Sequence, residues 1–508
     1  MRRSFYLHLC LVIFLSAASA IVWLLTKGET INGDEAVIGL MALKISKGLD
    51  FPIFYWKAHY SGPIASYLAA PLHLIWEPSA RLLHAVLLPL HIFYACGTYL
   101  LARKWLNAEY AFLVGLFAAL PAQLFPYSPL GGYTETMAII PWIFLFCLGN
   151  EDSIHEQETG FARFFIGGFL SGFALWIFPI ALPAVFVCLA FVYHDYRRKA
   201  FKSALVGCVA GLLPVLYYNL ANPGATFLRL FSRPLGIERA GFFSMLENGS
   251  PMSVLSKLST SWLNAVWKTL TSLPRFTLDL VGLGHPASAI AYPAGLLSLF
   301  ALFAGMWFCL RWKGRKVIPL SLFLMVLLNY AFVLFFGMDR WRYLVPVLMM
   351  VPFGLALCIH MCARRFRARS FTVVVILILL INGVSALGNK SHNPPDYQAL
   401  ANFLEDKGLT RGYADYFVAY SLVYLSNERL IYSPAFHTAS ADRYPPYTAV
   451  ASHADNPAFV FAGKEEAALF RQRLKQLNTA FREEGWEGFS IFYHLSPMPE
   501  LNKLETKF

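Results

Sequence analysis

The sequence predicts an α-helical polytopic membrane protein with a small C-terminal α/β domain. Of its 508 residues, 57% are hydrophobic and 14% are charged, and the mean hydropathy is positive, at 0.51. Soluble domains carry a charged fraction of about 25%. The apolar residues fall in blocks of roughly 18 to 22, the length that crosses a bilayer as a helix. After residue 388 these blocks stop, and charged residues occur throughout the rest of the chain.

We predict about eleven transmembrane helices, a number that fits blocks of this length. They lie at residues 5–26, 80–101, 109–126, 133–149, 161–178, 180–195, 202–220, 289–310, 317–337, 341–362 and 370–388. The first block follows two arginines and contains the small residues SAASA, as a cleaved signal peptide does. Because its apolar run continues to Leu25, we expect an uncleaved first span instead.

Basic residues cluster at every second gap between the apolar blocks. The clusters are Arg2 and Arg3; Arg103 and Lys104; Arg197, Arg198, Lys199 and Lys202; Arg311, Lys313, Arg315 and Lys316; and Arg364, Arg365, Arg367 and Arg369. This positive-inside pattern places the N-terminus in the cytoplasm and, with an odd number of spans, the C-terminus outside. The net charge of +12 therefore reflects the membrane topology of the chain, and we expect no nucleic-acid partner.

The chain is predicted to divide into a membrane domain at 1–388 and an extracytoplasmic α/β domain at 389–508. The outer loops 27–79 and 221–288 have the composition of helices that lie at the membrane interface. In the tail, RGYADYFVAY, ERLIYSP, PAFVFAG, KEEAALFRQRLKQLN and EGFSIFYHL alternate strand and helix patterns. The eight cysteines lie in or beside apolar blocks without Cys-x-x-Cys spacing, so neither a disulfide framework nor a zinc site is expected.

Ionisable side chains near the outer ends of the predicted spans come from distant parts of the sequence. They are Asp34, Glu35, Lys57, His59, Arg81, Glu135, Asp339, Arg340 and Arg342. The predicted topology places them all at the level where the outer leaflet meets water. The spans themselves are nearly free of acidic residues, which disfavours a transporter, because transporters place ionisable groups near mid-membrane.

The adjacent acids Asp34 and Glu35 follow the first span, in ETINGDEAVIGLMALKISKG. One interpretation is structural: Asn32 caps the next helix, and Glu35, three residues on, completes a capping box. The other is catalytic, because an acid at the bilayer edge with basic groups nearby is a candidate general base. The cap explains Asn32 and Glu35 better than it explains Asp34, which is therefore the preferred base.

Two further stretches have a structural and a functional interpretation. In FYWKAHYSGP, Lys57 either snorkels from an aromatic belt or binds an anionic head group. In GGYTE, Glu135 either favours the start of a helix that Thr134 caps, or is a second acid on the catalytic face.

The stretch DRWRY places two arginines, Arg340 and Arg342, on the outer face, against the positive-inside tendency. They either form an interfacial ion pair with Asp339 or bind a phosphate group, for which arginine is well suited. No glycine-rich phosphate loop, HExxH or GxSxG motif accompanies them.

Four motifs occur in a defined order: GDEA after the first span, YWKAHYSGPIASY in the first outer loop, GGYTE before the fourth span and RYLVP at a late span. Together they resemble the GT-C glycosyltransferases, in particular the branch of protein O-mannosyltransferases and aminoarabinose transferases (glycosyltransferase family 39). The resemblance covers about residues 1–390. The tail does not resemble the lumenal insert of the mannosyltransferases, so their protein acceptor is not implied.

This resemblance implies roles for the acids. Asp34 matches the acid on which catalysis depends in the family, and Glu35 completes the Asp-Glu pair of the mannosyltransferase branch. Glu135 matches a second outer-loop acid, although that position is usually Asp. The sequence-based catalytic group is therefore Asp34, Glu35 and Glu135.

The resemblance also implies a binding site for the donor phosphate. Lys57 falls where the aminoarabinose branch has a lysine near this phosphate, although it lies further from Pro63 than a Lys-Pro dipeptide allows. Tyr343 matches a tyrosine near the same group. The expected phosphate-binding residues are Lys57, Arg340, Arg342 and Tyr343, and the residues expected to line the donor or acceptor are His59, Tyr60, Arg81 and Tyr133.

We therefore expect an inner-membrane glycosyltransferase that moves a hexose or pentose from polyprenyl phosphate to a lipid, glycan or protein acceptor on the extracytoplasmic face. Asp34 is the expected base and the transfer inverts the anomeric carbon. No cofactor and no metal are expected, since protein cations can neutralise the leaving phosphate. The alternatives are a transporter or flippase for a lipid-linked or envelope saccharide, an O-antigen-ligase-like transferase that does not need Asp34, and a structural or assembly protein.

Overall fold

The computed structural model describes residues 2–122, 130–148, 160–196, 198–226, 230, 251–281, 283, 291–311, 317–338, 340–363, 368–388, 395–434 and 442–504. Its internal contacts divide the chain into two compact units. The helical unit comprises Met1–Thr26, Ile53–Ile64 and Leu87–Ser391, and the mixed unit comprises Lys27–Pro52, Ala65–Val86 and His392–Phe508. Most of the first predicted outer loop thus groups with the C-terminal residues.

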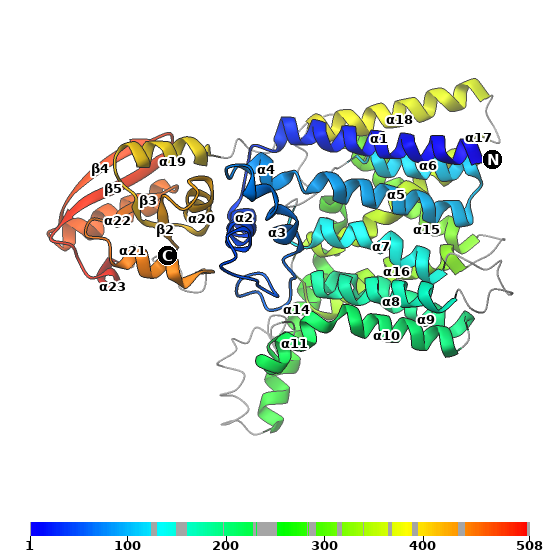
Figure 1. Cartoon of the computed structure of the whole chain (residues 1–508), viewed down its shortest axis with the longest axis horizontal. Coiled ribbons are helices and arrows are strands. Elements are labelled where there is room, and N and C mark those ends of the chain that lie inside the picture. The colour runs from blue at the N-terminus through cyan, green and yellow to red at the C-terminus, as the bar shows by residue number, and fades with distance from the viewer. Residues whose placement is uncertain are drawn as a thin grey trace. The chain divides into compact units, whose positions relative to one another are not determined.

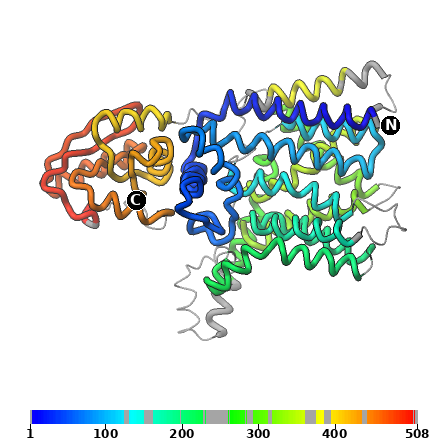
Figure 2. The backbone as a smooth tube through the Cα atoms, viewed as in Figure 1, coloured from blue at the N-terminus to red at the C-terminus, as the bar shows by residue number. Residues whose placement is uncertain are grey.

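The helical unit consists of helices that run mostly along one direction (Figure 1, Figure 2). Its elements are α1 (Arg2–Lys27), α5 (Leu87–Trp105), α6 (Ala108–Ala119), α7 (Tyr133–Leu148), α8 (Gly160–Ile177), η2 (Pro179–Ala181), α9 (Leu182–Asp195), α10 (Arg198–Gly211), α11 (Leu213–Ala221), α14 (Pro251–Leu280), α15 (Ala291–Arg311), α16 (Val317–Phe335), η3 (Trp341–Met349), α17 (Met350–Ala363) and α18 (Ala368–Gly388).

Proline residues mark several helix starts in this unit. Pro179 opens η2, and Pro183 and Pro214 lie in the first turns of α9 and α11, where a helix does not need the missing N–H. The chain bends by 51° between α10 and α11. The predicted span at 202–220 is therefore two helices joined at a bend.

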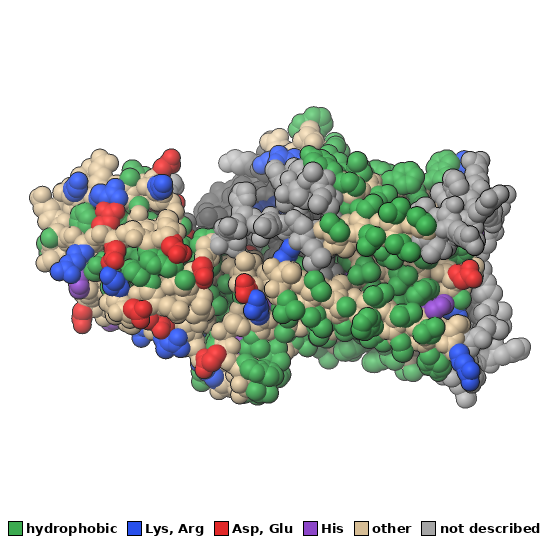
Figure 3. Space-filling model, turned by 90° about the horizontal axis from the view of Figure 1, so that it is seen from above, with side chains coloured by type: hydrophobic (Ala, Val, Ile, Leu, Met, Phe, Trp, Pro, Cys, Tyr) green, Lys and Arg blue, Asp and Glu red, His purple; other side chains and the backbone are tan. Residues whose placement is uncertain are grey.

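The multi-pass helical class is confirmed, and the number of spans stays a prediction. Among the described residues, five helices are long and apolar enough to cross a membrane, or six if the bent pair α10–α11 is one span. The five are Arg3–Lys27, Ala80–Trp105, Tyr292–Arg311, Val317–Phe335 and Trp341–His360. Other predicted spans coincide with shorter apolar helices, such as α7. Hydrophobic side chains cover much of the visible face of the helical unit (Figure 3).

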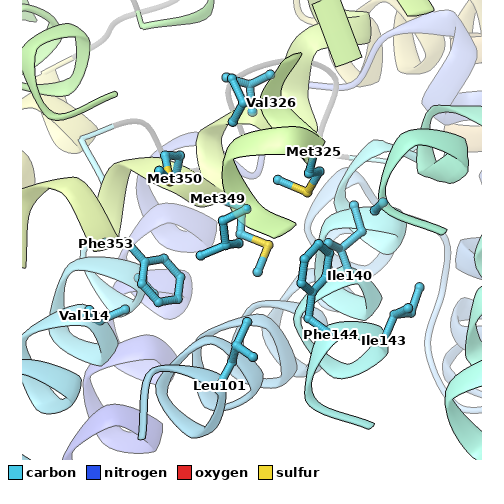
Figure 4. Packing of buried hydrophobic residues seen from close by; sticks show 14 of the residues in the cluster. Leu101, Val114, Ile140, Ile143, Phe144, Met325, Val326, Met349, Met350 and Phe353 are labelled. Carbon is cyan, nitrogen blue, oxygen red and sulfur yellow. The ribbon is translucent and has the colours of Figure 1, made fainter. Parts of the chain in front are cut away.

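The core of the helical unit joins helices that are distant in the sequence (Figure 4). Leu101 of α5, Val114 of α6, Phe144 of α7, Met349 of η3 and Phe353 of α17 are all fully buried in one cluster. Tyr343, Leu344 and Val345 of the RYLVP motif belong to the same cluster, so η3 is anchored in a close-packed interior.

The mixed unit combines short helices with one five-stranded sheet (Figure 1). Its helices are α2 (Gly33–Ser46), α3 (Ile64–Ala69, whose first residue belongs to the helical unit), η1 (Leu72–Leu74), α4 (Ala80–His84), α19 (Tyr397–Asp406), α20 (Tyr416–Leu425), α21 (Pro445–Ser452), α22 (Lys464–Gln476) and α23 (Leu501–Leu504). Its strands are β1 (Arg411–Ala414), β2 (Ile431–Ser433), β3 (Ala458–Phe461), β4 (Ala480–Trp486) and β5 (Phe489–Ser496).

The sheet has the strand order β2-β1-β3-β5-β4. β1 pairs in parallel with β2 and β3, and β5 pairs antiparallel with β3 and β4. Phe459, Phe461, Phe470 and Phe492 form its buried aromatic core. The predicted alternation of strand and helix in the tail is confirmed, and α19, α21, β4 and α23 are additional elements.

Several expectations fall on residues outside the described part of the chain. They concern Arg197, Lys313, Arg315, Lys316, Asp339, Arg364, Arg365 and Arg367 and most of the second outer loop between 227 and 250. Residues 251–280 of this loop form the long helix α14. Trp262 and Thr269 of α14 donate hydrogen bonds to the carbonyls of Phe335 and Met338, at 2.7 and 3.0 Å, and so attach α14 to the chain that precedes η3.

Candidate active site

Helix α2 begins with the predicted capping box. The N–H of Glu35 donates to Oδ1 of Asn32 at 3.0 Å, and the N–H of Asn32 donates to Oε2 of Glu35 at 3.2 Å. Glu35 is only 2% exposed, and its Oε2 lies 3.5 Å from Nε2 of His84. The structural interpretation of this stretch is confirmed, and the carboxylate of Glu35 holds the start of the helix.

Asp34 lies outside this cap and is half-buried. The hydroxyl of Tyr416, in the first turn of α20, donates a hydrogen bond to Oδ1 of Asp34 at 2.7 Å. The starts of α2 and α20 are in close contact: a Cβ atom on Gly33 would lie only 2.9 Å from Cα of Phe417. A glycine is needed at this close approach. The candidate base thus has a partner from the C-terminal part of the chain.

The middle of α2 also packs against α20. A Cβ atom on Gly39 would clash with the ring of Tyr424, which is fully buried. The hydroxyl of Tyr424 donates to the carbonyl of Ser79 at 3.1 Å and lies 3.4 Å from Nε2 of His73. Tyr424 therefore connects α20 with α2 and with the segment before α4.

The C-terminal end of α2 is bound through Glu428, just after α20. Lys44 and Lys47 approach its carboxylate at 2.5 and 2.9 Å, and the hydroxyl of Tyr447 donates to it at 2.9 Å. Burial by itself raises the pKa of Glu428, but hydrogen bonds from Lys44, Lys47 and Tyr447 outweigh burial and hold this pKa below its usual value. The carboxylate stays charged and anchors this end of α2.

The predicted lining residue Arg81 lies on α4, also in the mixed unit. Its guanidinium forms an ion pair with Glu29, and both side chains are largely exposed to solvent. Exposed pairs of this kind contribute little stability. On the same short helix, Nδ1 of His84 lies 3.1 Å from the carbonyl oxygen of Gly28. Both side chains connect α4 to the chain that leads into α2.

In the helical unit, the ring of Phe178 packs against three tyrosine rings, and Arg342 contacts two of them. The ring centroid of Phe178 lies 5.0 Å from that of Tyr133, 5.8 Å from that of Tyr60 and 6.5 Å from that of Tyr343. The guanidinium carbon of Arg342 lies 5.8 Å from the ring centroid of Tyr133 and 5.5 Å from that of Tyr343, within cation–π range. We call these five residues the arginine–aromatic cluster.

Glu135 lies in the first turn of α7, two residues after Tyr133, and is 1% exposed. Its carboxylate accepts hydrogen bonds from the N–H groups of Gly132 at 2.9 Å and Gly131 at 3.4 Å. Both glycines have positive φ, at +97° and +104°, and a Cβ atom on Gly132 would lie 2.9 Å from the ring of Phe178. Glu135 therefore orders the turn before α7, and this turn packs against the arginine–aromatic cluster.

The segment 53–64, which carries Lys57 and His59, is attached to the break between α8 and η2. The N–H of Gly62 lies 3.0 Å from the carbonyl oxygen of Trp176, and Nε1 of Trp176 donates to the carbonyl of Ile53 at 2.9 Å. Lys57 is exposed with a φ of +59°, whereas His59 is half-buried with its Nδ1 2.5 Å from the hydroxyl of Tyr218. This attachment places Tyr60 in the arginine–aromatic cluster.

The predicted residues therefore fall into two groups, one in each unit. Asp34, Glu35 and Arg81 belong to the mixed unit, and Lys57, His59, Tyr60, Tyr133, Glu135, Arg340, Arg342 and Tyr343 belong to the helical unit. Arg340 is exposed at the residue before η3, outside the ring contacts that Arg342 makes.

Three residues of these groups were not predicted: Tyr416, Phe178 and His84. Only Phe178 had a signal in the sequence, because a proline follows it where an apolar block ends. Among the described residues, no three His, Cys, Asp or Glu side chains form a group that could hold a metal ion.

Comparison of the sequence with family models finds no match, and no curated protein is significantly similar in sequence. Solved structures do resemble this chain. One is ArnT from Cupriavidus metallidurans bound to undecaprenyl phosphate, with a TM-score of 0.66 and 14% identity over 96% of this chain and 99% of ArnT. The apo form of that ArnT gives a TM-score of 0.64 at 12% identity, over 95% of this chain and 97% of the other.

A second similar structure is the oligosaccharyltransferase of Archaeoglobus fulgidus, in complex with Zn and sulfate. Its TM-score is 0.54 at 13% identity, over 91% of this chain and 69% of the other. ArnT and this oligosaccharyltransferase are both GT-C glycosyltransferases. The chain therefore has the GT-C fold that its four motifs predicted for about residues 1–390, and the similarity to ArnT extends over nearly the whole chain.

Proposed function

We propose that this protein is an integral membrane glycosyltransferase that uses a polyprenyl-phosphate sugar as its donor. The observation that carries the proposal is the fold similarity to an ArnT structure bound to undecaprenyl phosphate, over nearly the full length of both chains. The arginine–aromatic cluster supports it from the residues themselves. Arg342 supplies a permanent positive charge with planar hydrogen-bond donors, the type of group that binds phosphate.

In this proposal the arginine–aromatic cluster binds the donor. Arg342 contacts the phosphate, and the rings of Tyr133 and Tyr343 fix the plane of its guanidinium. Lys57 and Arg340, both exposed, are further cations for the same phosphate. Positive charge that is already in place stabilises the negative charge developing on the leaving group. We therefore propose transfer without an obligatory metal.

Asp34 is the proposed base. The acceptor hydroxyl oxygen attacks the anomeric carbon, and its proton passes to the carboxylate of Asp34. The bond between the anomeric carbon and the phosphate oxygen breaks, and polyprenyl phosphate leaves with the electron pair. A single displacement inverts the anomeric carbon. Glu35, which is engaged in the capping box, then has a positioning role, and so does Glu135, which orders the turn before α7.

The proposed location is the bacterial inner membrane, with the N-terminus in the cytoplasm and the C-terminal domain at 389–508 on the extracytoplasmic side. This orientation rests on the basic clusters in alternate loops. It places the candidate base on the side where an envelope acceptor, whether a lipid, a glycan or a protein, is available.

The test is a transfer assay with the full chain in membranes and a panel of radiolabelled undecaprenyl-phosphate sugars. Label should move from the lipid to an envelope acceptor, with release of undecaprenyl phosphate. Arg342→Gln should raise the KM for the donor by about tenfold, the value of one charge-assisted hydrogen bond. The control is Arg311→Gln, which removes an arginine stacked on Trp307 at the end of α15.

Two results would contradict the proposal. Transfer of no sugar in the panel, combined with movement of the intact lipid-linked sugar across the membrane, would favour a flippase. An unchanged donor KM in the Arg342→Gln protein would remove the arginine–aromatic cluster from the donor site.

A further inference from the structure

The tyrosine that contacts Asp34 is held in a fixed position by the C-terminal part of the chain. Tyr416 follows β1 and stands in the first turn of α20, directly after the helix cap Asp415. One carboxylate oxygen of Asp415 accepts hydrogen bonds from the N–H groups of Phe417 and Val418, at 2.8 and 3.1 Å. The backbone around Tyr416 is therefore determined by both a strand end and a helix cap.

The ring of Tyr416 is also surrounded by specific contacts. It packs edge-to-face on Phe417 and Tyr420, with ring centroids 5.4 and 5.2 Å apart. The guanidinium carbon of Arg443 lies 5.8 Å from its centroid. On the α2 side, a Cβ atom on Gly33 would lie 3.0 Å from two ring carbons. These contacts on several sides restrict the ring to one orientation, with its hydroxyl directed at Asp34.

We propose that Tyr416 is a positioning residue for Asp34, so that the C-terminal domain takes part in catalysis by fixing the base. This inference rests on the proposed function of Asp34. A hydrogen bond to Oδ1 fixes the rotation of the carboxylate and so directs Oδ2, the oxygen that would accept the proton of the acceptor hydroxyl. Small errors in the placement of a base lower the rate strongly, because the base acts only within hydrogen-bond reach.

The remaining contacts between α2 and the C-terminal residues explain why the hydroxyl and the carboxylate stay together. The packing of Gly39 on Tyr424 and the ion pairs of Lys44 and Lys47 with Glu428 hold α2 along its full length. Tyr416 can therefore lose its hydroxyl without releasing α2. This separates a positioning role from a structural one in experiment.

The test is Tyr416→Phe in the full-length protein, assayed for sugar transfer in membranes. This change removes the hydroxyl and keeps the ring packing. We expect kcat to fall by about 10- to 100-fold, the range for one hydrogen bond to a charged group, with the KM of donor and acceptor within about twofold of the original. The thermal unfolding midpoint in detergent should be unchanged.

The matched control is Tyr493→Phe. Tyr493 lies on β5 in the same unit, and its hydroxyl donates to the carboxylate of Glu484 at 3.1 Å. Tyr493→Phe loses the same kind of hydrogen bond, but to a carboxylate of β4 and not to Asp34. We expect its kcat and KM to equal those of the unmodified protein. An equal loss of kcat in both variants would overturn the positioning role.

A double-mutant cycle separates this inference from the proposed function. Asp34→Glu keeps an acid but displaces it, so adding Tyr416→Phe should cost less than about twofold in that background, against about 10- to 100-fold alone. Full additivity of the two losses would overturn the positioning role.

Two further outcomes distinguish the two failures. If Tyr416→Phe kept the kcat of the unmodified protein while Asp34→Asn was inactive, the positioning role would be overturned and Asp34 would remain the proposed base. If Asp34→Asn transferred sugar at the rate of the unmodified protein, both the role of Asp34 as base and the positioning role of Tyr416 would be overturned.

Discussion

Two helix pairs, one in each unit, are held together by different forces. In the helical unit, α8 and α10 approach so closely that a Cβ atom on Gly168, Gly172, Gly207 or Gly211 would clash with a backbone carbonyl of the other helix. In the mixed unit, α2 and α20 share glycine contacts too, but they are joined in addition by the Asp34–Tyr416 hydrogen bond. The α8–α10 interface rests mainly on close steric packing, with one hydrogen bond from the hydroxyl of Ser203 to the carbonyl of Phe161 at 2.7 Å, whereas the α2–α20 interface is partly electrostatic.

The difference reflects the two solvents that the chain is predicted to meet. In lipid, the hydrophobic effect does not drive helices together, so close backbone packing through small residues takes its place. Gly168 and Gly172 on α8, and Gly207 and Gly211 on α10, are two small-xxx-small pairs of this kind. In water, charges and hydrogen bonds are available, and they make the interface that carries the candidate base sensitive to pH and to single polar substitutions.

The largest effect is expected at the steric interface. In Gly172→Leu, the new side chain would overlap the carbonyl of Cys208, which belongs to the backbone and cannot rotate away. We expect a destabilisation of at least about 3 kcal/mol and loss of folded protein after detergent extraction. Gly383→Leu is the control, because a Cβ atom at Gly383 meets nothing within 4 Å. Equal thermal unfolding midpoints for the two variants would refute the steric interface.

A smaller effect is expected for Gly39→Leu in α2. Here the obstacle is the ring of Tyr424, a side chain that can shift, so we expect about 1 to 3 kcal/mol. Hydrogen–deuterium exchange of the α20 amides, residues 416–425, should become faster while that of α8 stays the same. Gly485→Leu, at an exposed and open position in β4, should leave α20 unaffected. If the α20 amides exchanged equally slowly in Gly39→Leu and in the unmodified protein, the contact between Gly39 and Tyr424 would be refuted.

The smallest effect is the electrostatic one, and it depends on pH. The pKa of Glu428 is lowered in the folded protein, so its contribution is fully present above the unfolded value of about 4.3 and is lost as pH falls through the folded pKa. Glu428→Gln should cost about 1 to 2 kcal/mol at pH 7 and nothing below that pKa. Exchange of the α20 amides at pH 7 and at pH 4 and below measures this.

The control for Glu428 is Glu500→Gln, which removes an exposed ion pair with Lys503. We expect no change in α20 exchange, because exposed pairs contribute little. If Glu428→Gln showed the same pH dependence as the unmodified protein, the lysine contacts would not account for the stability of this interface.

Much of the fold could be predicted from the sequence, because lipid imposes a length and a hydropathy on each helix. The helices α1, α15, α16 and α18 lie within a few residues of their predicted positions. The bend in 202–220 was not predicted, although Pro214 lies just after it. Strand β4 was missed because its sequence, AFREEGW, is mostly charged and exposed, so it lacks the alternation that marks a half-buried strand.

The candidate site was only partly predictable. The capping box could be predicted because it is formed by residues three positions apart. The proximity of Arg342 and Tyr343 could be predicted because they are neighbours in one motif. The contact between Asp34 and Tyr416 joins residues 382 positions apart. No local pattern indicates such a pairing, since it depends on how α2 packs on a helix of the C-terminal domain. The grouping of residues 27–52 with the tail was unpredictable for the same reason.

We propose that Asp34 is the base of a sugar transfer from polyprenyl phosphate. The turnover of Asp34→Asn should be measured with the undecaprenyl-phosphate sugar that the unmodified protein accepts. We expect kcat to fall by about 10²- to 10⁴-fold, the usual contribution of a general base, with an unchanged thermal unfolding midpoint. Asp406→Asn, at an exposed aspartate of the same unit, should keep full turnover. If Asp34→Asn turned over nearly as fast as the unmodified protein, Asp34 would not be the base.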